Sequence, residues 1–79
     1  MNYEKIIVIS YSGYKGEERP KTFILYGDEI NVIEIIDMWI KEDLRDKGRK
    51  RFFKVVGSDG YIYRIYFDEN NGEWFLAKG

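Results

Sequence analysis

The fold class of this chain depends on residues 29–47, which read EINVIEIIDMWIKEDLRDK. A helix over this segment would begin at an N-cap, Asp28, and end before Gly48. Its apolar stripe would contain Ile33, Ile36, Ile40 and Leu44. A strand is favoured by the five β-branched residues among positions 30–36, because their χ1 angles are restricted against a preceding helical turn. We therefore predict a long, bent strand to about residue 40, then a polar excursion over 41–50 with one helical turn near 41–47.

The segments before this stretch also favour strands. Residues 5–11 contain a continuous β-branched run, which is typical of a strand that is buried on both sides or at the centre of a sheet. Residues 12–20 hold two glycines and the only proline, and we predict a loop there. Residues 22–26 alternate between two faces, and Gly27-Asp28 is expected to form a tight reversal.

The C-terminal half has the pattern of a β-meander. Residues 51–56 form a predicted strand that ends at a turn over 57–60. Residues 61–67 alternate strictly between two faces. Asn71-Gly72 is a strong hairpin signal, and residues 73–77 complete the last predicted strand.

These segments predict one mostly β domain over residues 1–79, built as a small five- or six-stranded antiparallel barrel or coiled meander sheet. The alternative is an α+β domain of order ββαβββ with a helix over 29–47. A chain of this size buries only about 60–65% of its unfolded surface. We therefore expect both indole side chains, Trp39 and Trp74, to lie in the core.

Composition argues against several classes of function. The chain has no Cys and no His, so we expect no disulfide, no metal site and no cofactor. No motif for catalysis is present, and we expect no enzymatic activity. The N-terminus lacks a basic region, and its apolar run over 6–9 is too short for a signal peptide. We expect a cytoplasmic protein without a membrane partner.

Charge is uneven along the chain although the net charge is only −1. Residues 41–56 carry seven basic and three acidic side chains, between two segments with an acidic excess. Within this stretch, basic residues interleave with Phe52 and Phe53, a combination that can follow phosphates and stack bases. The candidate nucleic-acid or partner surface contains Lys47, Arg49, Lys50, Arg51, Lys54, Tyr61, Tyr63 and Arg64.

A second candidate feature is Arg19, which stands directly before the proline. The residue before a proline is held extended, so its guanidinium could be fixed against a carboxylate. We predict a structural clasp between Arg19 and either Glu34 or Asp37.

A series of short motifs runs through nearly the whole chain: YSGYK at 11–15, ERP at 18–20, Phe23, Gly27, Val32, Ile36, Asp37, Trp39, FFKV at 52–55, DG at 59–60, Tyr63, Asp68 and EWFL at 73–76. Their order resembles a family of short, uncharacterised prokaryotic proteins. A similar domain looks to be fused at the C-terminus of some Y-family polymerase-like proteins of bacterial DNA-damage mutagenesis. Those fused versions carry extra aromatic residues where residues 41–50 are charged apart from Leu44 and Gly48. The resemblance implies no catalytic residues.

Two functions follow as expectations. The first is a non-enzymatic module that binds another protein, which the nearly neutral charge favours. The alternative is a module that binds single-stranded nucleic acid through residues 49–54 and the Tyr-rich strand 61–67, with a link to DNA damage tolerance. The sequence leaves the partner and the oligomeric state open.

Overall fold

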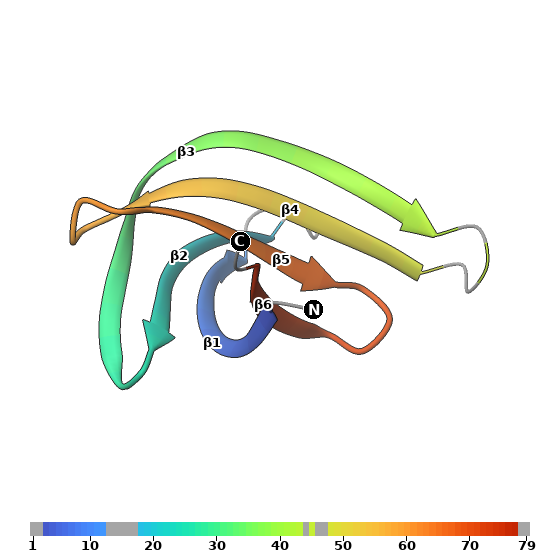
Figure 1. Cartoon of the computed structure of the whole chain (residues 1–79), viewed down its shortest axis with the longest axis horizontal. Helices are drawn as coiled ribbons and strands as arrows, with labels where there is room; N and C mark the ends of the chain where they lie inside the picture. The colour runs from blue at the N-terminus through green and yellow to red at the C-terminus, as the bar shows by residue number, and fades with distance from the viewer. Residues whose placement is uncertain (1–2, 13–17, 44, 46–47, 78–79) are drawn as a thin grey trace.

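The computed structural model describes residues 3–12, 18–43, 45 and 48–77, which form six antiparallel strands that close into a small barrel (Figure 1). In chain order the strands are β1 (Tyr3–Ser12), β2 (Glu18–Leu25), β3 (Asp28–Asp43), β4 (Gly48–Gly57), β5 (Ile62–Asp68) and β6 (Glu73–Ala77). Each strand pairs with its neighbours in the chain, and β1 pairs with β6 to close the barrel. The predicted mostly β fold is confirmed, and of the alternatives left open for it the structure has six strands and a closed barrel. None of the described residues is helical.

The segment on which the fold class depends is a strand and is longer than predicted. β3 ends at Asp43 rather than near residue 40, and β4 already begins at Gly48. Lys41 lies opposite Lys50 and Glu42 lies opposite Arg49, so the two charged stretches pair with each other. The predicted polar excursion is therefore wrong for residues 41–43 and 48–50, because main-chain pairing between neighbouring strands satisfies their backbone. Residues 44, 46 and 47 of the predicted helical turn lie outside the described residues.

The predicted loop over 12–20 is also shorter than expected. Residues 18–20 belong to β2 and pair with the end of β1, where Ser10 lies opposite Pro20. The register shifts between Ile9 and Ser10 at this point. A proline lacks the N–H that a regular ladder needs and is tolerated where the ladder is irregular. Residues 13–17 lie outside the described residues.

A two-residue loop joins β2 to β3. Its residues are Tyr26 and Gly27, with φ angles of 51° and 83°, so the reversal lies one residue earlier than predicted. Positive φ at both positions is the mark of the type I′ hairpin turn, whose twist matches that of the flanking strands. The Tyr26 hydroxyl donates a hydrogen bond to Glu4 of β1 at 3.0 Å, which ties the turn to a strand beyond β2.

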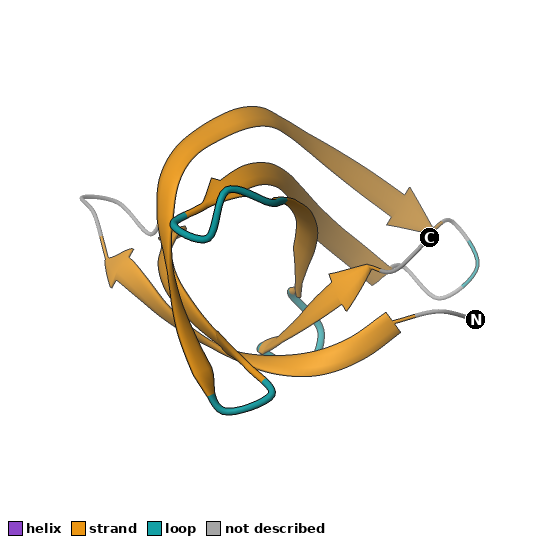
Figure 2. Ribbon diagram, turned by 60° about the vertical axis from the view of Figure 1, so that its left-hand side comes forward, coloured by secondary structure: helices purple, strands orange, loops and turns teal. Residues whose placement is uncertain are grey.

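The core fills the inside of the barrel. Figure 2 shows the ring of strands that surrounds it. Its buried side chains come from every strand: Ile6, Phe23, Ile30, Phe53, Val55, Ile65, Trp74 and Leu76. We call the side of the sheet that these residues line the inner face and the opposite side the outer face. Within the described part of the chain there is no helix of the length and apolarity that a membrane span requires. The cytoplasmic location stays a prediction.

The two tryptophans have different environments. Trp74 is 7% exposed, and its ring lies 5.6 Å from Phe53 and 5.1 Å from Phe67, measured between ring centroids. Its predicted core position is confirmed. Trp39 is half-buried on the outer face and stacks on Phe52, so its predicted core position is wrong. Alternation along β3 gives the inner face to Met38 instead, which lies opposite Phe53.

β3 pairs with β2 and with β4 over successive parts of its length. Residues 28–31 pair with β2, whereas the pairing with β4 covers residues 32–43. Beyond the β2 contact, β3 and β4 continue as a long hairpin that extends past the rest of the barrel (Figure 1). Over the described residues, no strand pairs with the second edge of β3 from 32 to 43, and we call this the free edge.

Candidate functional site

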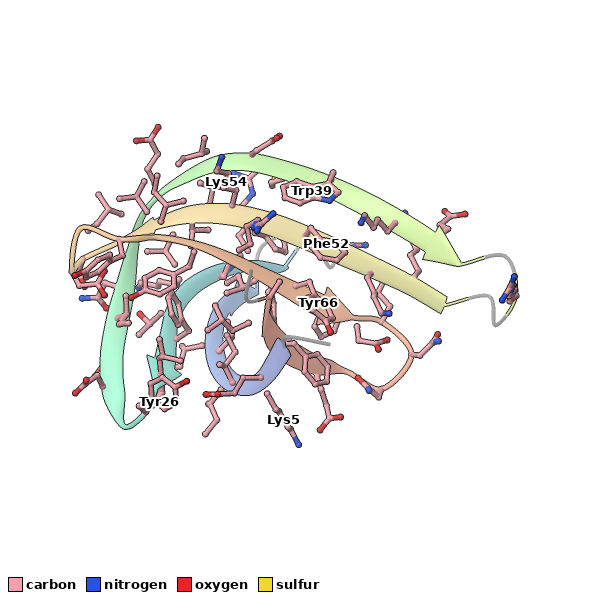
Figure 3. All side chains as sticks on the ribbon, viewed as in Figure 1. Lys5, Tyr26, Trp39, Phe52, Lys54 and Tyr66 are labelled. Carbon is pink, nitrogen blue, oxygen red and sulfur yellow. The ribbon has the colours of Figure 1, made fainter. Side chains whose placement is uncertain are left out.

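An aromatic row crosses the outer face of four strands. It consists of Trp39, Phe52, Tyr66 and Phe75, which lie opposite one another in the registers of β3 to β6. Successive ring centroids are 5.4, 4.9 and 5.1 Å apart, with interplanar angles of 8°, 30° and 25°. Figure 3 shows Trp39, Phe52 and Tyr66 following one another across three neighbouring strands. Such cross-strand pairs stabilise a sheet by about 0.2–1 kcal/mol each.

Two lysines lie over rings of the aromatic row. The Lys41 Nζ atom is 5.3 Å from the centroid of Phe52, and the Lys50 Nζ atom is 5.9 Å from that of Tyr66. Both distances are within the range of a cation–π contact. The outer face therefore combines stacked aromatic rings with positive charge along the length of the hairpin.

Cations also lie directly opposite each other on this face. Lys41 pairs with Lys50 across β3 and β4, on one side of the aromatic row. Lys54 pairs with Arg64 across β4 and β5, on its other side, and neither forms an ion pair with a described residue. Like charges in directly opposed positions destabilise a sheet. Each pair also has a carboxylate opposite one of its cations, since Asp68 lies opposite Lys50 and Asp37 lies opposite Lys54.

The structure divides the predicted basic surface between the two faces of β4. Lys50 and Lys54 alternate with Phe52 on the outer face, together with Arg64 of β5. Arg49 and Arg51 point to the other side, where their Nε atoms lie 3.7 and 2.6 Å from the Glu69 carboxylate. The alternation of a strand separates these side chains, and the sequence reasoning missed it because residues 48–50 were predicted as irregular.

The remaining predicted residues do not join a common surface. Tyr61 is exposed and lies directly before β5. Tyr63 belongs to the inner side, with its ring 5.1 Å from that of Phe23 in an edge-to-face contact. Lys47 lies outside the described residues.

A hollow of about 490 Å³ lies on the inner side of the long hairpin. Its lining comes from β2, β3 and β4: Arg19, Met38, Trp39, Ile40, Arg49, Arg51, Phe52 and Phe53. The predicted clasp is not formed, since no ion pair joins Arg19 to Glu34 or Asp37. Arg19 lines the hollow instead, and the Asp37 carboxylate accepts a hydrogen bond from the backbone N–H of Met38 at 2.9 Å.

β3 exposes large apolar side chains beside its free edge. Ile33 is 67% exposed, Ile36 45%, Met38 50% and Ile40 49%. Met38 and Ile40 face the hollow. The sequence marked these residues as strand-forming, but only the pairing pattern shows that one edge of their strand lacks a partner among the described residues.

The turn between β4 and β5 contains a short hydrogen bond. The Tyr63 hydroxyl donates to the Asp59 carboxylate at 2.5 Å, and this carboxylate also accepts from the backbone N–H of Tyr61. The bond to the Tyr63 hydroxyl lowers the pKa of Asp59 below its ordinary 3.8. The same bond raises the pKa of Tyr63 from 10.0 to about 12.

We expect this bond to make stability depend on pH at both ends of the scale. Since the pKa of Asp59 is lowered in the fold, its contribution is present above the ordinary carboxyl pKa and lost as pH falls through the lowered value. Since the pKa of Tyr63 is raised, its contribution to stability is present below pH 10.0 and is lost as the pH rises through about 12.

Two variants test the assigned cause of these pKa shifts. In Tyr63→Phe, carbon-detected NMR should show the Asp59 pKa returning towards 3.8. In Asp59→Asn, ultraviolet titration should show the Tyr63 pKa falling towards 10.0, and an unchanged value would contradict the assigned cause.

No protein-family model, no curated protein and no solved structure matches the chain. The resemblance to the short prokaryotic family therefore stays a prediction. Within the described residues, no group of three or more Asp or Glu side chains is placed to hold a metal ion.

Proposed function

We propose that this chain is a non-enzymatic protein-binding module, and that it docks an extended segment of a partner along the free edge of β3. The observation that carries the proposal is the long edge over residues 32–43, which has no partner strand among the described residues although its side chains are largely apolar. Such an edge offers a row of N–H and C=O groups to another chain.

Natural proteins usually shorten, charge, bulge or cover an edge of this kind, and β3 has register shifts against β4 at 32–34 and 35–37. Strand addition uses it instead, with main-chain hydrogen bonds supplying affinity and side-chain pockets supplying specificity. Beside the free edge, Ile36, Met38 and Ile40 are each about half exposed. Exposed apolar groups that gather along one element favour a contact with another protein over contact with water.

The hollow supports a choice of partner sequence. In an added strand, every second side chain would lie on the inner side, beside Met38 and Ile40. Arg19 stands at the same hollow without an ion pair to a described carboxylate. A partner strand therefore fits the inner side if every second residue is apolar and one of these positions holds an Asp or Glu that can pair with Arg19.

Selection from a library of random peptides, followed by an NMR titration, tests the proposal. We expect the selected peptides to have apolar residues at every second position. On binding, they should shift the amide signals of residues 32–43. Met38→Lys, which places a charge beside the edge, should weaken binding at least about tenfold. Ile62→Lys is the matched control, because Ile62 is similarly exposed at 59% but lies on β5. Peptides that perturb other strands, or equal losses in both variants, would contradict the proposal.

A second candidate is the binding of single-stranded nucleic acid on the outer face. The observation that favours it is the pair of opposed cations on each side of the aromatic row, Lys41 with Lys50 and Lys54 with Arg64. Each pair has only one carboxylate in its row, Asp68 opposite Lys50 and Asp37 opposite Lys54, so two positive charges stand against one negative charge. A polyanion that ran along the row would relieve the repulsion in both pairs. Tyr66 is buried, so the half-buried rings of Trp39, Phe52 and Phe75 would have to stack the bases. The proposed path differs from the predicted one, since it uses only Lys50, Lys54 and Arg64 of the predicted residues.

A single-stranded oligonucleotide in the same titration separates the two candidates. Binding on the outer face would shift signals of β4 and β5 and weaken with salt, by about 0.7 in log affinity per phosphate contact for each log unit of salt. Lys54→Glu combined with Arg64→Glu should then reduce that slope. Arg49→Glu is the matched control, since Arg49 faces the other side of β4. An oligonucleotide that shifts no signal at low salt would remove this candidate.

A further inference from the structure

We propose that the partner at the free edge is a second copy of this chain, with the two β3 strands antiparallel and Trp39 opposite Trp39 of the copy. The inference rests on the proposed function, because it uses the same edge. It goes further by naming the occupant and the register.

Symmetry restricts the possible registers. Most protein dimers have a two-fold axis, and the interface is then self-complementary. When two copies of the same edge pair antiparallel, the two-fold axis that relates them is perpendicular to the sheet. The outer faces of the two copies then lie on the same side of the joined sheet. Each candidate register is therefore centred on one residue that lies opposite itself, and residues at equal distances on either side of it pair across the axis.

Charge and polarity select one centre among residues 37–41, which follow the last register shift between β3 and β4. Centres at Asp37 and at Lys41 place like charges opposite each other, which is unfavourable. A centre at Met38 places Asp37 opposite the indole of Trp39, and a centre at Ile40 places Met38 opposite Glu42. These four registers each place an unfavourable pair at or near the axis.

The centre at Trp39 is complementary on both faces. On the outer face it places Asp37 opposite Lys41 of the copy, and symmetry repeats this pair. On the inner face it places Met38 opposite Ile40 of the copy, again twice. Both of these apolar side chains are about half exposed in the single chain, so the pairing buries them together.

The aromatic row gives an independent reason for the same centre. Trp39 is the end of the row, and among the described residues it stacks only on Phe52. It is half-buried, with its other side towards the free edge. Centring the dimer on Trp39 brings the two rows end to end, so that stacking continues across the axis. Figure 3 shows Trp39 on the outermost strand of the sheet, next to no further strand.

The interface is short, since it involves one strand from each copy. Interfaces of small area form weak and transient complexes. We therefore expect a dimer that dissociates on dilution, and sedimentation equilibrium from low-micromolar to millimolar protein measures its dissociation constant.

Charge exchange tests the register. Asp37→Lys alone and Lys41→Asp alone each replace two attractive pairs with two repulsive ones, and each should raise the dissociation constant about tenfold. The double variant restores opposite charges and should return the constant to within about threefold of the wild type. Glu29→Lys is the matched control, because it makes the same charge change on β3 where β2 already pairs. It should leave the constant unchanged, and circular dichroism confirms that each variant is folded.

Two results would overturn the inference: a wild-type chain that stays monomeric at millimolar concentration, or a double variant as impaired as the single ones. A monomeric chain that still binds library-selected peptides at residues 32–43 would overturn the second copy alone and leave the protein-binding function in place. Failure of those peptides in a chain that dimerises with the expected charge dependence would instead restrict the edge to self-association.

Discussion

Trp74→Ala is expected to remove most of the protein's stability against unfolding. The indole is 7% exposed and packs on Phe53 and Phe67, so its removal leaves a cavity that the short strand β6 cannot fill. Truncations of this kind cost about 3–5 kcal/mol. The whole stability of a small domain is about 5–15 kcal/mol and lies towards the lower end for a chain of this length. Urea unfolding followed by circular dichroism measures the loss.

Trp39→Ala is the matched control, since it removes the same side chain from the outer face. Trp39 keeps one stacked neighbour and has solvent on its other side, so we expect a loss of only about 1 kcal/mol. The variant should remain folded. Equal losses in the two variants would contradict the assignment of one indole to the core and the other to the surface.

Gly57→Ala should produce the second large effect, because the position has no room for a methyl group. A Cβ at Gly57 would lie 2.7 Å from Asp59 Oδ1, 2.8 Å from Ile30 Cγ2 and 3.0 Å from a ring carbon of Tyr63. These atoms belong to the turn, to β3 and to β5, so relief in one direction tightens the contact in another. Overpacking of this kind costs about 1–3 kcal/mol.

The measurement for Gly57→Ala is again urea unfolding, with the denaturant slope as a second readout. We expect the midpoint to fall while the slope stays constant, which indicates lower stability without a change in the surface exposed on unfolding. The hydrogen bond from Tyr63 to Asp59 should weaken as well, because both side chains must move. A wild-type midpoint would show that the turn tolerates a side chain and that the contacts at Gly57 are not restrictive.

Much of the fold could be predicted from local pattern. The β-branched residues at 30–36 disfavour a helix through their own side-chain torsions, whatever surrounds them. The strict alternation at 61–67 and the Asn71-Gly72 turn define a hairpin within a short stretch of chain. The errors were at the ends of elements. Lys41 and Glu42 are polar enough to suggest a loop, but pairing with Lys50 and Arg49 of the facing strand keeps them extended.

The candidate site could be predicted only in part. Lys50, Lys54 and Arg64 were identified from composition, and they do share the outer face. Arg49 and Arg51 were placed with them, whereas alternation turns these two towards Glu69. The sequence contained the signal for this division, because odd and even positions of one strand cannot share a face. It was missed because residues 48–50 were not recognised as strand.

By itself the sequence determined the class of the fold, because strand propensity and turn chemistry act between residues that are close in the chain. It also determined the lack of thiol and imidazole groups. The aromatic row and the free edge were decided only by the tertiary structure. The aromatic row forms because the registers of β3, β4, β5 and β6 place one aromatic residue of each strand opposite the next, although the four residues are far apart in the chain. The free edge exists because β2 pairs with β3 over only four residues, and the length of that contact depends on how the closed barrel shares its strands.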